Sequence, residues 1–125
     1  MIISTAFLVA GGVYFVARKK TDAPTTPNTT QQTTKNSSAT ITYSDTGFSP
    51  STLTVKSGDS VTVTNISSSE LQMESDPHPA HTDNGDLNAG EIQSSQSKTF
   101  TVTKTGTFGY HNHLKPDAQG SITIK

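Results

Sequence analysis

The sequence contains no cysteine among its 125 residues. Without thiolates the chain can hold no disulfide framework, no iron–sulfur cluster, no Cys-ligated zinc finger and no thiolate-bound copper. Cysteine usage therefore also says nothing about the redox compartment. Any metal site would have to be built from other side chains.

Apolar residues are scarce as well, at 30% of the chain, and the N-terminal segment takes a large share of them. The length allows one small domain with extensions, and its thin core is typical of a small all-β domain. Residues 40–125 carry five lysines against nine acids, a formal balance of −4. A nucleic-acid partner needs a basic face, so this balance argues against nucleic acid and favours a cationic partner such as a metal ion.

The only four histidines form two tight clusters, His78-Pro79-Ala80-His81 and His111-Asn112-His113. A single histidine would more often be a surface or hydrogen-bonded residue than a ligand. Imidazole is, however, the commonest metal ligand, and two pairs could complete one coordination sphere if the fold brings them together. The clustering predicts a metal site made by His78, His81, His111 and His113.

Residues 1–17 form an uncharged, mostly apolar run that ends at Arg18-Lys19-Lys20. Its length lies at the short end of the range of about 17–25 residues for a membrane-spanning helix. A positive n-region and an Ala-x-Ala-like cleavage site are both missing, which disfavours a cleaved signal peptide. We therefore expect residues 1–20 to be a membrane anchor, with a signal segment as the alternative.

Residues 21–38 are rich in Thr, Pro, Asn, Gln and Ser and predict a disordered spacer. Spacers of this composition commonly hold a domain off an outer surface. The basic residues after the apolar run favour the opposite orientation by the positive-inside tendency. We expect a cell-membrane protein, single-pass or signal-anchored, with its domain on the extracytoplasmic side.

Residues 39–125 show a period of two. Each of six segments puts two apolar side chains on one face of an extended chain: Ile41 and Tyr43, Leu53 and Val55, Val61 and Val63, Phe100 and Val102, Phe108 and Tyr110, Ile122 and Ile124. Turn signals such as Ser57-Gly58-Asp59 separate them. The pattern predicts an all-β fold, an antiparallel β-sandwich of six or seven strands. The polar stretch from Asn65 to Ser97 predicts a long functional loop that carries the first histidine cluster.

The domain resembles the cupredoxins, the copper-binding Greek-key β-sandwiches of plastocyanin and amicyanin. The resemblance rests on three segments: the one from Gly47 to Val61, the tetrapeptide Asp76-Pro77-His78-Pro79 at the place of the first family ligand, and the closing segment from Gly106 to Ile124. It implies that the loop with His78 and the closing loop lie at one end of the sandwich, which would bring the two histidine clusters together.

The blue-copper site of that family is not carried over. Its closing motif has a cysteine, a histidine and often a methionine where this chain has Asn112, Lys115 and Ala118. Only His78 matches a family ligand. An intense blue centre and plastocyanin-like electron transfer are therefore not expected.

A different site is predicted instead. Residues i and i+2 of a strand point to the same side, so His111 and His113 could chelate together while Asn112 faces away. If His111 lies on the opposite face, as its family counterpart would suggest, the site shrinks to two or three histidines with water or carboxylate. Four neutral imidazoles favour Cu(II), with zinc and nickel as competitors.

Nearby groups could support this site. Asp76, Asp83 or Glu74 could accept the second N–H of a ligand imidazole and so fix its tautomer. Met73 could supply a thioether to Cu(I), although a core position fits it better.

We expect a membrane-tethered, extracytoplasmic copper-binding protein that buffers or delivers copper and is not an enzyme. An unidentified protein would donate or accept the metal. A copper redox or electron-transfer protein and a metal-free cupredoxin-like scaffold for protein interaction are the alternatives. A copper oxidoreductase would need a vacant coordination position and a substrate pocket, for which the sequence shows no insertion.

Overall fold

The computed structural model describes residues 36–125. The predicted anchor of residues 1–20, and the predicted spacer up to residue 35, lie outside the described residues. Within residues 36–125 there is no helix long and apolar enough to cross a membrane.

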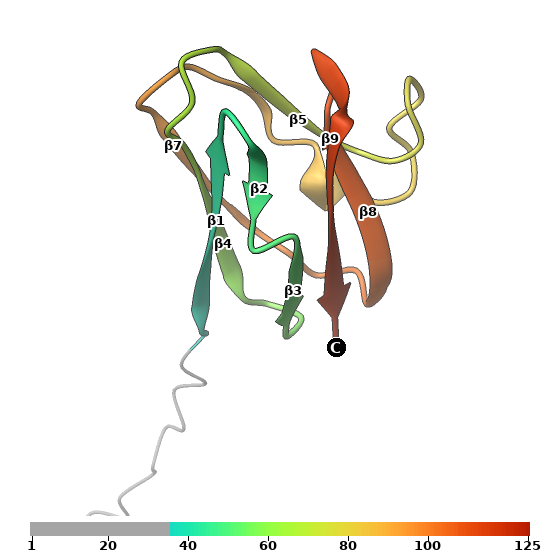
Figure 1. Cartoon of the computed structure of the whole chain (residues 1–125). Coiled ribbons are helices and arrows are strands. Elements are labelled where there is room, and N and C mark those ends of the chain that lie inside the picture. The colour runs from blue at the N-terminus through green and yellow to red at the C-terminus, as the bar shows by residue number, and fades with distance from the viewer. Residues whose placement is uncertain (1–35) are drawn as a thin grey trace, which may run out of the picture. The chain divides into compact units, whose positions relative to one another are not determined.

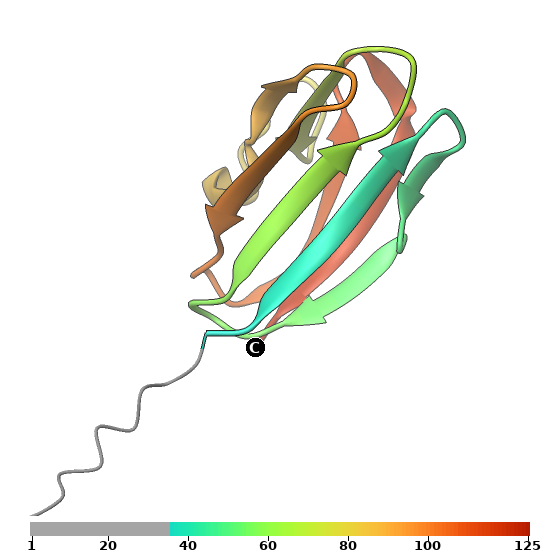
Figure 2. The same cartoon turned by 90° about the vertical axis from the view of Figure 1, so that its left-hand side faces the viewer.

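Two β-sheets pack face to face and form a β-sandwich (Figures 1 and 2). The strands are β1 (Ser38–Ser44), β2 (Gly47–Ser49), β3 (Thr52–Val55), β4 (Ser60–Asn65), β5 (Leu71–Ser75), β6 (Gly90–Ile92), β7 (Ser97–Thr101), β8 (Gly106–Asn112) and β9 (Lys115–Ile124). One sheet has the strand order β2-β1-β4-β7 and the other β3-β9-β8-β5-β6. The predicted all-β sandwich is confirmed, and each of the six apolar pairs marks a strand, with Val102 directly after the end of β7.

The prediction of a purely antiparallel sandwich is wrong, because both sheets are mixed. Strand β1 pairs with β4 in parallel, and β3 pairs with β9 in parallel. The cause lies between β2 and β3, where the chain passes from one sheet to the other at Pro50. Proline cannot donate a ladder hydrogen bond, so it interrupts strand pairing there. Apolar alternation shows which face of a strand is buried but not the direction of its neighbour.

The core comes from both sheets. Its fully buried side chains include Ile41, Val61 and Val63 from one sheet and Leu71, Tyr110 and Ile122 from the other. Burying one such aliphatic or aromatic side chain contributes about 1.5–3 kcal/mol. Tyr110 fits only because its neighbour at position 120 is glycine, since a Cβ there would overlap the tyrosine ring.

The stretch from Asn65 to Ser97 is not the long loop that its polarity predicts. It contains β5, β6 and the short 3-10 helix η1 (Gly85–Leu87). The sequence hides β5 because only Leu71 and Met73 of its five residues are apolar. Its polar residues Glu74 and Ser75 are buried as well, and hydrogen bonds make this burial possible. For example, the amide of Ser75 donates to Asn88 Oδ1 at 2.8 Å.

The two ends of the described chain lie at the same end of the sandwich (Figure 1). Gly106 and Ile124 are partners at that end of the β8–β9 ladder, whereas Asn112 and Lys115 are partners at the other end. The second histidine cluster therefore lies at the end of the domain opposite to the chain termini.

Candidate metal centre

Pairing between β5 and β8 places the two histidine clusters side by side. Glu74 of β5 is the register partner of His111 in β8. The loop that follows β5 therefore leaves the sheet next to His111, and it carries His78 and His81. His113 follows directly after β8, where its amide donates to the carbonyl of Gln72 at 2.7 Å.

All four imidazoles lie together. The ring centroid of His78 lies 5.2 Å from that of His111, 4.8 Å from that of His113 and 6.0 Å from that of His81. The His81 centroid lies 5.2 Å and 4.9 Å from those of His111 and His113. One ring nitrogen from each of His78, His111 and His113 lies within 4.8 Å of the other two. The fold thus brings together residues that are about thirty positions apart in the sequence.

His111 is the buried member of the group, with 1% of its surface exposed. Its Nδ1 lies 2.7 Å from Asp76 Oδ1. A carboxylate only accepts, so in the neutral imidazole Nδ1 carries the proton and Nε2 has a free lone pair. That Nε2 atom is buried and has no hydrogen-bond partner among the described residues. A buried polar atom without a protein partner costs about 1–3 kcal/mol, and binding of an ion or a water molecule is one of the few explanations for such an atom.

Gly109 makes the contact between Asp76 and His111 possible. Its carbonyl accepts the Asp76 amide at 3.0 Å, and a Cβ at this position would overlap the Asp76 carboxylate. A glycine inside a strand often marks such a close approach. Its place between Phe108 and Tyr110 is a signal that sequence analysis could have used and did not.

His81 is held in an unusual backbone conformation, with a φ of 56°. Non-glycine residues rarely adopt this left-handed region, and they do so mostly where surrounding contacts enforce it. Here the His81 amide donates to the Pro77 carbonyl at 2.7 Å, and its carbonyl accepts from Asn88 Nδ2 at 3.0 Å. These bonds aim the ring at the cluster, where its Nε2 lies 3.1 Å from Nδ1 of His113.

A second carboxylate stands behind His81. Glu74 Oε2 lies 3.9 Å from His81 Nδ1, and Glu74 is buried. The predicted outer acids Asp76 and Glu74 therefore both lie behind imidazoles. Within residues 36–125 the Asp83 carboxylate pairs with no histidine, and the backbone carbonyl of Asp83 accepts from Lys104 Nζ.

His78 is the exposed member of the cluster, flanked by Pro77 and Pro79. Its pKa is lowered from the ordinary value near 6.5, first because nearby groups remove part of its hydration and then because the other three imidazoles would repel its charge. His78 therefore stays neutral, with a lone pair to offer, at a lower pH than an isolated histidine would.

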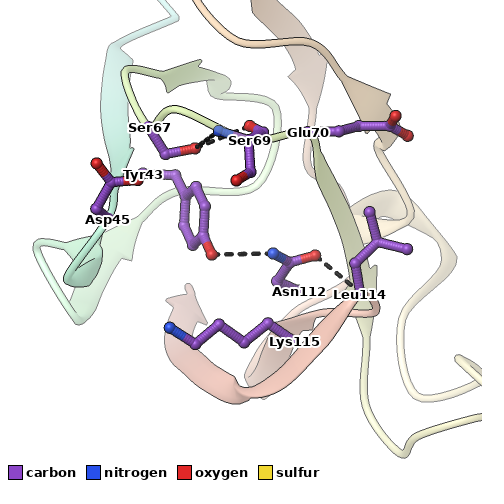
Figure 3. A pocket seen from close by; sticks show the side chains of 8 residues that line it. All are labelled: Tyr43, Asp45, Ser67, Ser69, Glu70, Asn112, Leu114 and Lys115. Atoms are coloured by element: carbon purple, nitrogen blue, oxygen red, sulfur yellow. Dashed lines mark hydrogen bonds between the residues drawn. The ribbon is translucent and has the colours of Figure 1, made fainter.

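Asn112 points away from the histidines, as predicted. Its Nδ2 donates to the Tyr43 hydroxyl at 2.9 Å, and its Oδ1 accepts the amide of Leu114 at 3.0 Å (Figure 3). The same Oδ1 also accepts the amide of Gln72 at 3.1 Å. A hollow of about 350 Å³ lies on this side and is lined by none of the four histidines. The alternative in which His111 lies on the other face from the remaining histidines is wrong.

The residues present fit a metal ion with nitrogen ligands but not a blue-copper centre. Metal–nitrogen bonds of about 2.0–2.1 Å hold two ligand atoms no more than about 4.2 Å apart, so the three nitrogens, which lie within 4.8 Å of one another, would move closer together around an ion. Neutral imidazoles suit copper, zinc and nickel. Met73 is fully buried in the hydrophobic core, which confirms the core position that its sequence context favours.

Comparisons with known proteins agree on the fold. The profile of the cupredoxin-like domain matches residues 7–124. A purple cupredoxin from Nitrosopumilus maritimus superposes with a TM-score of 0.60 at 19% identity, over 70% of this chain and 99% of that one. A methionine-to-alanine variant of amicyanin in the Cu(I) form gives a TM-score of 0.56 at 22% identity, over 70% of this chain and 82% of that one. No curated protein sequence matches the chain.

Proposed function

The chain belongs to the cupredoxin-like domain family, and we propose that its domain binds one Cu(II) ion through His78, His111 and His113, with His81 as a fourth ligand. The observation that carries this proposal is the buried Nε2 atom of His111, which has no hydrogen-bond partner among residues 36–125 and belongs to a ring whose centroid lies 5.2 Å from those of both His78 and His81. Copper(II) is the strongest binder of the divalent first-row series at nitrogen sites, ahead of zinc and nickel.

The four imidazoles play different parts in this proposal. His111 is held by Asp76 with its lone pair free, so it is ready to bind without rearrangement. His113 and His81 share a hydrogen bond between their rings. One of these rings therefore directs an N–H at the other, and His81 Nε2 and His113 Nδ1 can bind an ion only after that bond opens. His78, being exposed, would be the first imidazole that an incoming ion meets.

The site supports binding, buffering or delivery of copper better than catalysis. The hollow beside Asn112 lies on the side of β8 away from the histidines, so it offers no substrate pocket at the site. Electron transfer of the plastocyanin type would need a thiolate ligand, which this chain lacks.

We also propose that residues 1–20 anchor the protein in the cell membrane, with the domain on the extracytoplasmic side. The apolar run and the Thr/Pro-rich spacer in the sequence support this. The described chain begins at the end of the sandwich opposite to the β8–β9 turn, so a tether there would leave the histidines accessible to a protein that donates or accepts copper.

A Cu(II) titration of the full-length chain, followed by electron paramagnetic resonance, tests the binding. We expect a one-to-one complex with a tetragonal signal and nitrogen splitting, lost in His78→Ala and His113→Ala. Thr82→Ala is the matched control, because Thr82 is an exposed residue of the same loop without an imidazole. Weak binding that is indifferent to both histidine substitutions would overturn the proposal and leave a scaffold for protein interaction.

A further inference from the structure

Two carboxylates support the histidine cluster from behind. Asp76 Oδ1 lies 2.7 Å from Nδ1 of His111, and Glu74 Oε2 lies 3.9 Å from Nδ1 of His81. Both acids come from β5 or the residue directly after it, the strand that pairs with β8. Glu74 is buried, with 8% of its surface exposed, and Asp76 is half-buried.

No cation balances these two carboxylates. In the part of the chain that the structure describes, their ion-pair contacts within 4.0 Å are with the two imidazoles alone. Gln72 Nε2, which is uncharged, donates to Glu74 Oε1 at 3.4 Å. A negative charge taken out of water without a partner is costly, so acids in such places are normally paired or lie close to a metal.

We infer that Asp76 and Glu74 make the site selective for a divalent ion, so that it holds Cu(II) in preference to Cu(I). This inference rests on the proposed function and adds the residues that set the preference for the divalent ion. Four neutral imidazoles and two carboxylates have a formal charge of −2. A divalent ion brings this to zero, whereas a monovalent ion leaves one uncompensated negative charge in a partly buried site.

The chemical types of the available ligands also favour Cu(II) over Cu(I). Cu(I) is favoured by soft thiolate and thioether ligands. The chain has no cysteine, and the thioether of Met73 is buried in the hydrophobic core. Imidazoles with carboxylates behind them are more basic ligands, and loss of such a carboxylate typically lowers metal affinity about 10–100-fold.

Asp76 also has a positioning role that can be separated from its charge. It fixes His111 in the tautomer with the proton on Nδ1, and Gly109 leaves the room that the Asp76 carboxylate occupies. In Gly109→Ala the Asp76 carboxylate is displaced although its charge remains in the chain. This variant therefore distinguishes a carboxylate acting at His111 from a general effect of net charge.

The test is a pair of competition titrations, with Cu(II) alone and with Cu(I) alone, on the full-length chain and its variants. In Asp76→Asn we expect a 10–100-fold loss of Cu(II) affinity and a clearly smaller loss of Cu(I) affinity. Glu74→Gln should show the same difference to a lesser degree, because its contact is longer. Glu91→Gln is the control, since Glu91 is an exposed acid on the edge strand β6 and its replacement changes the net charge equally.

Nitrogen NMR of the metal-free protein gives a second readout that does not depend on copper. His111 should show protonated Nδ1 in the unsubstituted chain and in Glu91→Gln, and a changed or mixed tautomer in Asp76→Asn and Gly109→Ala. These spectra also show whether each variant is folded.

The outcomes separate the two proposals. If the unsubstituted chain binds Cu(II) one-to-one but Asp76→Asn and Glu74→Gln weaken Cu(I) as much as Cu(II), or no more than Glu91→Gln does, the preference for a divalent ion is overturned alone. If the unsubstituted chain binds no copper at the histidines, the proposed function fails and this inference fails with it. A selective loss of Cu(II) affinity together with the tautomer change supports both.

Discussion

The buried polar side chains on the two sides of strand β8, near its C-terminal end, differ in how completely they are hydrogen-bonded. On the core side, the amide group of Asn112 makes three hydrogen bonds, to Tyr43, Gln72 and Leu114. On the other side, His111 makes one bond to Asp76 and leaves a buried nitrogen without a partner. Both residues are almost completely buried, so exposure does not distinguish them.

The difference shows how a structural polar residue can be told from a ligand. A satisfied amide such as Asn112 stabilises the turn between β8 and β9 and has no capacity left for an ion. The Nε2 atom of His111 has that capacity, and a ring nitrogen of His111 lies within 4.8 Å of one ring nitrogen from each of His78 and His113. The resemblance to the cupredoxins aligns Asn112 with the metal-binding cysteine of that family, and on this alignment the proposed site lies on the other side of the strand from the cysteine position.

The largest expected effect comes from replacing the histidine of this pair. His111→Ala should lower Cu(II) affinity by more than about 100-fold, because loss of an outer carboxylate alone costs about 10–100-fold and a direct ligand contributes more. A competition titration of the full-length chain measures it. An affinity within threefold of the unsubstituted chain would mean that the ion does not use His111, and the contrast between the two sides would then lose its functional meaning.

Replacing Asn112, the neighbour of His111, should lower the stability of the protein and leave its Cu(II) affinity nearly unchanged. Asn112→Ala leaves the Gln72 and Leu114 amides and the Tyr43 hydroxyl without their partner, so we expect a loss of about 2–3 kcal/mol in the free energy of unfolding. Urea unfolding of the metal-free protein measures this loss. Cu(II) affinity of the folded variant should stay within threefold. A hundredfold loss of affinity here would show that both sides of β8 contribute to one site.

Much of this arrangement could be predicted from the sequence. The period of two located the strands that carry the core, and the two histidine clusters indicated residues that the fold does bring together. The i, i+2 rule also placed His111 and His113 on one side and Asn112 on the other. The strands and the sides of β8 depend on local chain geometry, which a single sequence contains, whereas the meeting of the two clusters was implied by the resemblance to the cupredoxins.

Features that depend on long-range pairing could not be predicted in the same way. The parallel pairing of β1 with β4 follows from which strands meet, and alternation contains no information about that. Strand β5 was hidden because its buried polar residues are stabilised by partners such as Asn88, thirteen positions away. The choice of Asp76 over Asp83 as the acid beside His111 depends on the room left by Gly109.

A smaller effect on stability tests whether a buried polar atom without a partner indicates a binding site by itself. The hydroxyl of Tyr110 is also buried and has no hydrogen-bond partner among residues 36–125, and burial raises the pKa of Tyr110 to about 12. Tyr110→Phe should therefore be neutral or stabilising by up to about 1 kcal/mol, since no bond is lost. Tyr43→Phe removes the acceptor of the Asn112 Nδ2 bond and should cost about 1 kcal/mol or slightly more.

Thermal and urea unfolding of both tyrosine variants measure this difference. Neither change should alter Cu(II) affinity, because neither hydroxyl lies among the imidazoles. If Tyr110→Phe destabilises the protein more than Tyr43→Phe, the Tyr110 hydroxyl has a partner, and the comparison of satisfied with unpartnered groups must be revised for the core as well.

The smallest expected effect is a pH dependence on the histidine side of β8. The pKa of His78 is lower in the folded protein than its ordinary value near 6.5. Below about pH 6.5 the unfolded chain therefore binds a proton more readily than the folded one, so the stability of the metal-free protein decreases as pH falls through this range. The decrease should be small, because His78 is exposed. Urea midpoints between about pH 7.5 and 5 measure it, and His78→Ala should flatten the slope. A slope that persists unchanged in His78→Ala would place the responsible proton on another group, whereas a slope that Cu(II) removes would place it on the residues that hold the ion.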